Sequence, residues 1–519
     1  MTKQRYPIGV QSFEEIRRGG YVYVDKTSYI HRLLQGSKYY FLGRPRRFGK
    51  SLLLSTIKSF FEGKRELFEG LAIASCDDVE WNAHPVIHLD LNAENYSDEY
   101  ALDSRIGTQL NYYEDKYDVK SGSSTLAGRF LSVIETSHRK TGRQAVVLID
   151  EYDKPILDTI HMDELSEVYR NKLRGFYSVL KSADDHLKFA ILTGVTKFGH
   201  LNIFSGLNNL RDISLSNEYS GICGITEREL EDNFKAGVGS LADSMSLSYV
   251  DAMRMLKEHY DGYHFSQNSP DVYNPYSVLN CLEDKDFRDY WFQTGTPTFL
   301  INLLRERDYN ITCLEGCECE ERRLYGVDVA ASDLIPVLYQ SGYLTIKGFD
   351  REFRAYTLGF PNKEVMDGFF SSLVEYYTGS ADSGRASIRQ LVKNIREGNA
   401  DGFMKGLQSF FSSISYEMSL DRESNFQNVL YVLLRLIGFY VEVEKRTSDG
   451  RIDILIETSK NVYVIELKVD STPEDALSQI NGKNYSLPYA SDNRVLHKIG
   501  VNFSKKTRTI TGWAVETEG

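Results

Sequence analysis

The chain has 519 residues, of which 41% are hydrophobic and 26% charged, and its formal net charge is −12. This length is too great for one hydrophobic core, and the acidic balance argues against a general nucleic-acid coat. The most apolar window, VLYVLLRLIGFYVEV at 429–443, is shorter than the roughly 20 residues that a bilayer span needs, and the N-terminus has no apolar signal region. We therefore expect a multidomain globular protein that stays in the cytoplasm and off the membrane.

The first 70 residues form the basic part of the chain, with 14 Lys and Arg against 6 Asp and Glu. There, KYYFL (38–42) is typical of a strand and SLLLSTIKSFFEG (51–63) of a helix that ends at a glycine. The stretch between them ends in the Gly-Lys-Ser of a phosphate-binding loop. It has five residues instead of four between Gly43 and Gly49, with Arg44 where the first glycine is expected.

The residue types at the end of this loop suit a nucleotide. Gly49 permits the turn, Lys50 neutralises the outer phosphates, and Ser51 can ligate magnesium at the N-terminus of the following helix. Arg46 and Arg47 face either the phosphates or the solvent. A Gly-Lys-Ser alone occurs by chance, so the assignment needs a second motif.

That second motif lies about 100 residues downstream. AVVLID (145–150) is a buried-strand pattern that ends in Asp150 and Glu151, as in a Walker B motif. Asp150 can hold magnesium, and Glu151 can orient and activate the attacking water. Thr193, which ends the next predicted strand, is either a sensor of the γ-phosphate or an ordinary strand-end threonine. Together with the loop, this motif predicts binding of ATP with Mg²⁺ and, less directly, its hydrolysis.

The remaining pattern predicts a division into four parts. Strand-like runs PVIHLDL (85–91), AVVLID and HLKFAILTG (186–194) alternate with helical segments such as 163–184, which indicates a parallel α/β sheet with helices on both faces over residues 1–225. Residues 226–375 are tyrosine-rich and mainly helical, typical of an accessory lid or winged-helix-like domain. A helical connection (376–420) leads to residues 421–519, where a helix at about 423–437 is followed by strands.

The last part contains a second group of chemically active residues. In GRIDILIE…VYVIELKVD, Glu466 and Lys468 fall on the same side of one predicted strand, and Asp453 falls on the preceding antiparallel strand, across a turn near 458–461. Two carboxylates can hold Mg²⁺ or Mn²⁺, whose bound water can attack a phosphodiester, and the lysine can position that water. The alternative is an amphipathic hairpin with a charged outer face.

These motifs resemble known families. RPRRFGKS, LIDEYDKP and LTGVTKFGHLNIFSGLNNL resemble the bacterial AAA-ATPase-like family, related to AAA+ and STAND ATPases, and DGYHF and YNPYS extend the resemblance beyond residue 225. The resemblance implies a P-loop ATPase. It also implies that the opening segment of the chain borders the base of the nucleotide, with residues 25–27 near that base.

Residues 421–515, and RTSDGRIDILIET with NYSLPYA in particular, resemble the PD-(D/E)XK nuclease superfamily, which has a restriction-endonuclease-like fold. This second resemblance implies that Asp453 and Glu466 bind the metal, that Lys468 completes the catalytic site, and that Gln479 supports it from the following helix. Glu423 matches a further ligand position poorly.

The interpretation is an ATPase with a metal-dependent nuclease-like domain that acts on nucleic acid, with DNA favoured over RNA; homo-oligomer formation is left open. Its rival is a nucleotide-controlled regulatory switch whose last domain binds a partner or nucleic acid without cleaving it. The presence of Asp453, Glu466 and Lys468 together favours the enzyme. Against it, residues 421–519 hold slightly more acidic than basic residues, whereas nucleases usually present a basic groove.

Overall fold

A computed structural model describes most of the chain. The residues described are 4–92, 94–120, 122–160, 162–197, 209–292, 309, 311–324, 334–378, 381–412, 414, 423–436, 438, 440–447, 450–483, 487–489, 493–507 and 509–518. They fall into two compact units. The first unit comprises residues 1–294 and 316–365, and the second comprises residues 295–315 and 366–519.

A five-stranded parallel sheet forms the centre of the first unit, with strand order β2-β3-β4-β1-β5. Its strands are β1 (Tyr39–Gly43), β2 (Val86–Asp90), β3 (Ala145–Asp150), β4 (Leu187–Gly194) and β5 (Arg211–Asp212). All six residues of β3 are buried, as expected for a strand covered on both sides. The carboxyl ends of β1, β3 and β4 therefore meet at one edge of the sheet.

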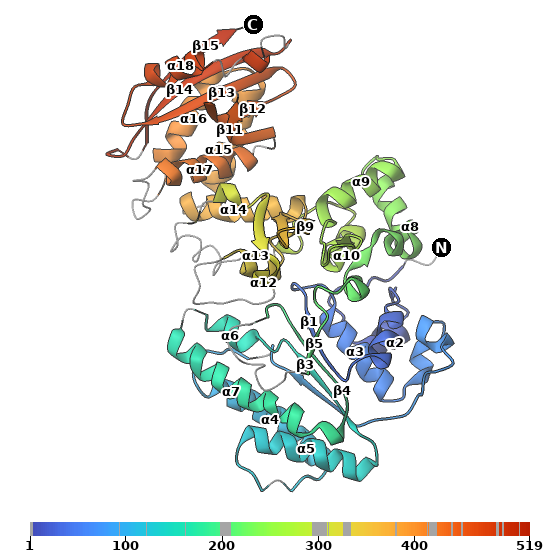
Figure 1. Ribbon diagram of the computed structural model, residues 1–519. Helices are drawn as coiled ribbons and strands as arrows, with labels where there is room; N and C mark the ends of the chain where they lie inside the picture. Colours follow the sequence, from blue (N-terminus) through green and yellow to red (C-terminus); the bar gives the residue numbers. More distant parts are fainter. Residues whose placement is uncertain are drawn as a thin grey trace. The chain divides into compact units, whose positions relative to one another are not determined.

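Helices cover both faces of this sheet (Figure 1). The chain crosses the sheet in one direction between β1 and β2 and returns in the other direction between β2 and β4. Because parallel crossovers are right-handed, the two directions place their helices on opposite faces. The crossover from β1 to β2 contains α3 (Lys50–Phe61). The helices α1 (Phe13–Arg18), which packs on α3, and α2 (Thr27–Gln35) precede β1. The crossovers in the other direction contain α4 (Ala101–Lys116), α5 (Leu126–Thr141), α6 (Lys154–Asp158) and α7 (Asp163–Ser182).

The accessory region of the first unit has its own hydrophobic core, in which Phe234, Leu256 and Tyr260 are buried. Its helices are α8 (Glu227–Ser244), α9 (Tyr249–Tyr260), α10 (Pro275–Asp284), α12 (Glu321–Leu324) and α13 (Ile335–Ser341). Its strands are β6 (Ile225–Thr226), β7 (Val272–Tyr273), β8 (Cys317–Glu320), β9 (Thr345–Asp350) and β10 (Ala355–Gly359). The antiparallel sheet β8-β10-β9 was not foreseen from the sequence. The chain then enters the second unit within α14 (Lys363–Thr378).

The second unit is built on a mixed five-stranded sheet of order β11-β12-β13-β14-β15. Its strands are β11 (Tyr440–Thr447), β12 (Gly450–Glu457), β13 (Asn461–Val469), β14 (Val495–Ser504) and β15 (Thr509–Glu518). Its helices are α15 (Ala381–Arg396), α16 (Ala400–Ser412), α17 (Glu423–Leu436) and α18 (Pro473–Gly482). On β13, Val464 packs with Ile480 of α18, whereas Tyr463 contacts Phe403 of α16. Alternate residues of β13 therefore meet helices on opposite faces of the sheet.

The α/β fold class predicted from the sequence is confirmed, because a parallel five-stranded sheet with helices on both faces and a separate C-terminal sheet are both present. The four-part division at residues 225, 375 and 420 stays a prediction.

Candidate functional site

The loop between β1 and α3 has the backbone of an anion-binding turn. Gly49 has a φ of 91° and caps the N-terminus of α3, a conformation that favours glycine. Arg47 also has a positive φ, of 66°. Lys50 is 5% exposed, and its Nζ donates to the carbonyl oxygens of Arg44 (3.0 Å) and Pro45 (3.1 Å). The loop thus curls around its own lysine at the start of a helix.

A cavity of about 430 Å³ opens beside this loop. Its wall includes Arg46, Arg47, Lys50, Ser51 and Glu151. The helix N-terminus and the three basic side chains favour an anionic ligand in this cavity, and its size suits a small molecule. The structure therefore gathers most of the predicted nucleotide-binding residues around one space.

Asp150 and Thr193 lie next to this cavity but are not part of its wall. Asp150 is 4% exposed, and its Oδ1 accepts hydrogen bonds from Thr193 Oγ1 (2.6 Å) and from the backbone N–H of Glu151 (3.1 Å). Thr193 is fully buried. In this structure the threonine orients the aspartate, and its contact with a nucleotide stays a prediction.

Glu151 has the environment of a tuned acid–base group. It has a φ of 51°, in the left-handed region that non-glycine residues seldom adopt. Burial raises the pKa of its carboxyl above the usual range, while Lys50 nearby lowers it. A glutamate that is strained, partly buried and on a cavity wall is a candidate general base.

Arg44 does not take the place of a phosphate-contacting glycine. It is 1% exposed, and its guanidinium donates to the carbonyl oxygens of Gly43 (2.9 Å), Ser214 (2.7 Å) and Tyr219 (3.1 Å). Burial lowers the pKa of this guanidinium. The arginine at this position therefore holds the loop to the segment after β5.

Sequence reasoning missed Asp153, which is 1% exposed and lies two residues after Glu151. Its Oδ2 accepts hydrogen bonds from the backbone N–H groups of Val195 (2.9 Å) and Thr196 (2.6 Å) and from Thr196 Oγ1 (2.8 Å). It fixes the turn that follows β4, which carries Thr193. A third acid in LIDEYD, directly after the strand, was the available signal.

A second polar cluster lies on β13 and α18 of the second unit. Gln479 donates through Nε2 to Glu466 Oε1 and accepts through Oε1 from Lys468 Nζ (2.6 Å). Lys468 Nζ also lies 3.4 Å from Glu466 Oε1. Glu466 is 3% exposed, and Leu467 between the two charged residues is buried. The structure thus brings together three of the residues predicted for the nuclease-like site.

This cluster depends on a close approach between α18 and β14. Glu466 pairs with Gly500 on β14, and a Cβ at Gly500 would lie 2.2 Å from the carbonyl oxygen of Pro473. The same Cβ would lie 2.6 Å from the backbone nitrogen of Leu477. Only glycine leaves room for the helix there, and the helix then carries Gln479 over Glu466.

The other two carboxylates predicted for this site are described only by their backbones. Asp453 lies on β12, directly before Ile454, which pairs with Ile465 on β13. Glu466 directly follows Ile465, so both residues adjoin the same cross-strand pair. Glu423 begins α17. The side chains of Asp453 and Glu423 lie outside the described part of the chain, so their metal-binding roles stay predictions.

Comparisons with known proteins match both parts of the chain in which these residues lie. A family model described as "Predicted AAA-ATPase" matches residues 7–204, and one described as "PD-(D/E)XK nuclease superfamily" matches residues 421–513. A curated protein of Azotobacter chroococcum mcd 1, "Uncharacterized protein in vnfD 5'region", is 35% identical over 530 residues, covering 100% of both chains. The chain belongs to the AAA-ATPase-like family, and its C-terminal domain belongs to the PD-(D/E)XK nuclease superfamily.

Among solved structures, the "Structure of the Aeropyrum Pernix ORC2 protein (ADPNP-ADP complexes)" matches 67% of this chain and 92% of that chain. The two are 11% identical, with a TM-score of 0.25.

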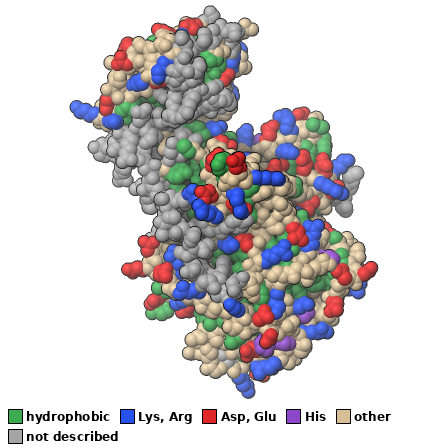
Figure 2. Space-filling view, in the orientation of Figure 1, with side chains coloured by type: hydrophobic (Ala, Val, Ile, Leu, Met, Phe, Trp, Pro, Cys, Tyr) green, Lys and Arg blue, Asp and Glu red, His purple; other side chains and the backbone are tan. Residues whose placement is uncertain are grey.

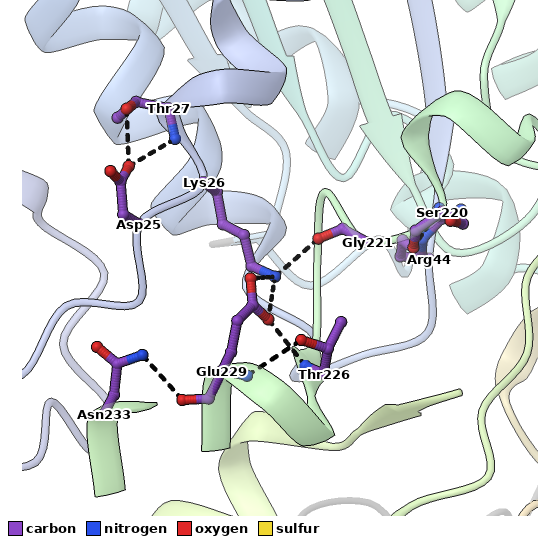
Figure 3. Close-up of polar contacts among 9 residues, drawn as sticks. All are labelled: Asp25, Lys26, Thr27, Arg44, Ser220, Gly221, Thr226, Glu229 and Asn233. Atoms are coloured by element: carbon purple, nitrogen blue, oxygen red, sulfur yellow. Dashed lines mark hydrogen bonds and ion pairs between the residues drawn. The ribbon is translucent and has the colours of Figure 1, made fainter. Parts of the chain in front are cut away.

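The opening segment of this AAA-ATPase-like chain meets the cavity at residues other than those expected. The stretch Pro7–Gln11 lines the cavity, together with Tyr276 of α10, and residues 25–27 do not. Instead, Asp25 accepts from the backbone and hydroxyl of Thr27, which starts α2 (Figure 3). The resemblance indicated a segment near the base but could not fix which of its residues reach the cavity.

Lys26 links this opening segment to the accessory region. Its Nζ donates to Glu229 on α8 (2.7 Å) and to the carbonyl oxygen of Gly221 (2.8 Å), as Figure 3 shows. Glu229 also closes a capping box with Thr226 at the start of α8. Asp25, Lys26 and Thr27 thus serve packing within the first unit.

Within the described part of the chain, no helix combines the length and the apolar character that a membrane span requires.

Proposed function

We propose that the first unit binds ATP in the cavity beside the phosphate loop and hydrolyses it. The cavity wall supports this proposal, because it joins the N-terminus of α3, Lys50 and Ser51 to Glu151 of the strand-end acidic pair. These groups suit a nucleotide: backbone N–H groups and cations can bind its phosphates from one side, and a carboxyl group faces them from the other. Arg46 and Arg47 add positive charge at the rim.

Each residue has a definite task in this proposal. Lys50 leaves the carbonyls of Arg44 and Pro45 and neutralises the outer phosphates, and Ser51 and Asp150 supply oxygen ligands for Mg²⁺. Thr193 keeps Asp150 oriented through the 2.6 Å hydrogen bond. Glu151, whose pKa is raised by burial, accepts the proton of the attacking water.

We further propose that the C-terminal domain cleaves a phosphodiester of nucleic acid, with DNA favoured over RNA. The Glu466–Gln479–Lys468 network carries this proposal, because it holds a buried carboxylate and an ammonium together beside the strand of Asp453. Carboxylate oxygens from Asp453 and Glu466 suit Mg²⁺ or Mn²⁺. When bound, such an ion lowers the pKa of its water and stabilises charge on the phosphate.

The chain's own groups then divide the remaining work. Gln479 restrains the Glu466 carboxylate, so that one oxygen keeps a fixed position. Lys468 presents a positive charge beside it, where it can orient a water or offset the developing negative charge on the phosphate. To reach the substrate, the Lys468 ammonium gives up its hydrogen bond to Gln479 and donates to a phosphate oxygen or a water instead.

One observation favours the rival function, a switch that binds without cleaving. On the face shown in Figure 2, Lys and Arg side chains are interspersed with Asp and Glu over the described surface, without a basic stripe on the atoms visible there. A titration with Mg²⁺ or Mn²⁺ on plasmid DNA and on RNA separates the two functions. Metal-dependent cleavage supports the enzyme, and its absence with and without ATP supports the switch.

The ATP proposal is tested by Lys50→Ala. Removing the ammonium eliminates the main countercharge to the outer phosphates, so we expect ATP binding to fall below detection in isothermal titration calorimetry. Lys58→Ala is the control, since Lys58 lies on the same helix α3 but is partly exposed, lies near Glu62 and does not line the cavity, so ATP affinity should stay unchanged. Unchanged ATP affinity in Lys50→Ala would show that the loop has been misread.

A further inference from the structure

The residues that make this phosphate loop unusual are each held by the accessory region. The guanidinium of Arg44 lies 4.2 Å from the ring centroid of Phe265, and Phe48 packs edge-on against Tyr263 at 4.7 Å. A Cβ at Gly342 would lie 2.7 Å from the Cβ of Pro45, so that backbone approaches the loop closely. Arg44, Pro45 and Phe48 of the loop therefore pack against the accessory region.

The two arginines that line the cavity have accessory partners as well. Trp291 Nε1 donates to the carbonyl oxygen of Arg46 (3.1 Å). The guanidinium of Arg47 lies 4.9 Å from the ring centroid of Tyr276, in the first turn of α10. Trp291 and Tyr276 thus fix one backbone oxygen and one side chain of the phosphate loop.

Both of these partners are connected to one buried carboxyl group. Glu364, in the first turn of α14, is 1% exposed. Its Oε1 accepts from the backbone N–H of Trp291 (2.6 Å), and its Oε2 accepts from Ser277 Oγ (2.7 Å), next to Tyr276. Glu364 therefore reaches the loop by two routes. One runs through two hydrogen bonds, by way of Trp291 to the carbonyl oxygen of Arg46. The other runs through the hydrogen bond to Ser277 and then through the neighbouring Tyr276, whose ring contacts the Arg47 guanidinium.

We propose that Glu364 is a positioning residue for the nucleotide site: it holds Trp291 and the first turn of α10, and through them sets the shape of the phosphate loop that receives ATP. This inference rests on the proposed ATP binding. It also assigns a task to the YNPYS motif, since Tyr276 contacts the loop and Ser277 binds Glu364. Glu364 itself does not touch the nucleotide.

The test combines ATP affinity with a signal from Trp291 in the full chain. The chain has three tryptophans, so Trp81→Phe with Trp513→Phe leaves Trp291 as the single emitter. ATP affinity is measured by isothermal titration calorimetry, and Trp291 emission is followed at saturating ATP. We expect Glu364→Ala to weaken ATP binding about tenfold, the effect of losing roughly one buried hydrogen-bond pair, and to abolish the ATP-induced change in Trp291 emission. Glu364→Gln, which keeps an acceptor for Trp291, should restore both.

Tyr290→Phe is the matched control. It removes a hydroxyl that bonds Asp284 (3.1 Å) beside Trp291 and has no described contact with the loop, so ATP affinity should stay at the wild-type value. A merely structural role of Glu364 would lower the melting temperature and leave the ATP affinity measured well below it unchanged. If Glu364→Ala does not fold, Trp291→Phe keeps an aromatic ring but removes the indole N–H that donates to Arg46, and it should still weaken binding.

The outcomes separate the two proposals. No ATP binding by the wild-type chain refutes the proposed function itself. Wild-type binding that is lost in Lys50→Ala but unchanged, with an unchanged Trp291 response, in Glu364→Ala overturns only the positioning role. Unchanged affinity in Trp291→Phe overturns it as well.

Discussion

At the scale of single residues, the first unit buries carboxyl groups where their protonation affects stability. Burial raises the pKa of Glu364 to about 8 and that of Asp261 to about 7. Glu364 is therefore largely neutral at pH 7, while the same group in the unfolded chain is ionised. At a pH between the unfolded pKa of such a group and its raised folded pKa, the folded state binds more protons than the unfolded state.

Because the folded state binds more protons than the unfolded state, we predict how stability changes with pH at Glu364. Because its folded pKa lies above its unfolded value of about 4.5, its contribution to stability is fully present below that value and is lost as pH rises to about 8. We expect the free energy of unfolding to fall over this range, by up to about 1.4 kcal/mol per pH unit for this one proton. Glu364→Gln should flatten that slope in urea titrations at several pH values, and an unchanged slope would contradict the assignment.

A residue could be predicted from the sequence when its role depends on its neighbours in the chain, and not when its partners are far away in the sequence. Lys50, Ser51 and Asp150 could be proposed as site residues because loops and strand ends carry their chemistry in adjacent residues. Arg44 was not, because its partners are backbone carbonyls at Ser214 and Tyr219, which have no side-chain signal. Glu364 binds residues 73 and 87 positions away, and a single sequence does not reveal such pairings.

At the scale of elements, the second unit depends on α18 lying close to β14. Gly500→Ala places a Cβ against the backbone of Pro473 and Leu477, so the helix must move away. We expect a loss of about 1–3 kcal/mol in the free energy of unfolding of this unit, together with weaker metal-dependent cleavage, because Gln479 moves away from Glu466.

Gly482→Ala, at the end of the same helix, is the matched control for this prediction. A Cβ at Gly482 would have no atom within 4 Å, so the substitution should change the stability by less than about 1 kcal/mol. Chemical denaturation and cleavage assays measure both variants. Equal effects of the two substitutions would show that the helix does not need the close approach.

The start of α8 offers a second test at this scale. Lys26 and Glu229 form an ion pair whose side chains are 11% and 23% exposed, and Lys26 also binds the Gly221 carbonyl. Lys26→Ala leaves that carboxylate and that carbonyl without their cation, so we expect a loss of about 3 kcal/mol or more in stability. The control is Lys257→Ala, which breaks an exposed ion pair between Lys257 of α9 and Glu227 of α8. It should lower the free energy of unfolding by less than about 1 kcal/mol.

The elements themselves were largely predictable from the sequence. AVVLID is β3 to the residue, and the predicted helices at 51–63 and 163–184 correspond to α3 and α7 with shifts of one or two residues at their ends. The small sheet β8-β10-β9 escaped because its strands are short and lie among turns and charged residues. Its pairing joins residues near 318 and 357, and no local pattern encodes that.

At the scale of the whole molecule, the chain joins an AAA-ATPase-like unit to a nuclease-superfamily domain. The chain enters the second unit within α14, whose first turn carries Glu364. In our account the two chemistries use separate residues, so each can be removed without the other.

The most direct test of this account compares wild type with Asp453→Ala in a single assay with plasmid DNA, Mg²⁺ or Mn²⁺, and ATP. We predict metal-dependent cleavage by the wild type, its loss in Asp453→Ala, and equal ATP hydrolysis by both. Equal cleavage by the two proteins, or no cleavage by the wild type with either metal, would contradict it.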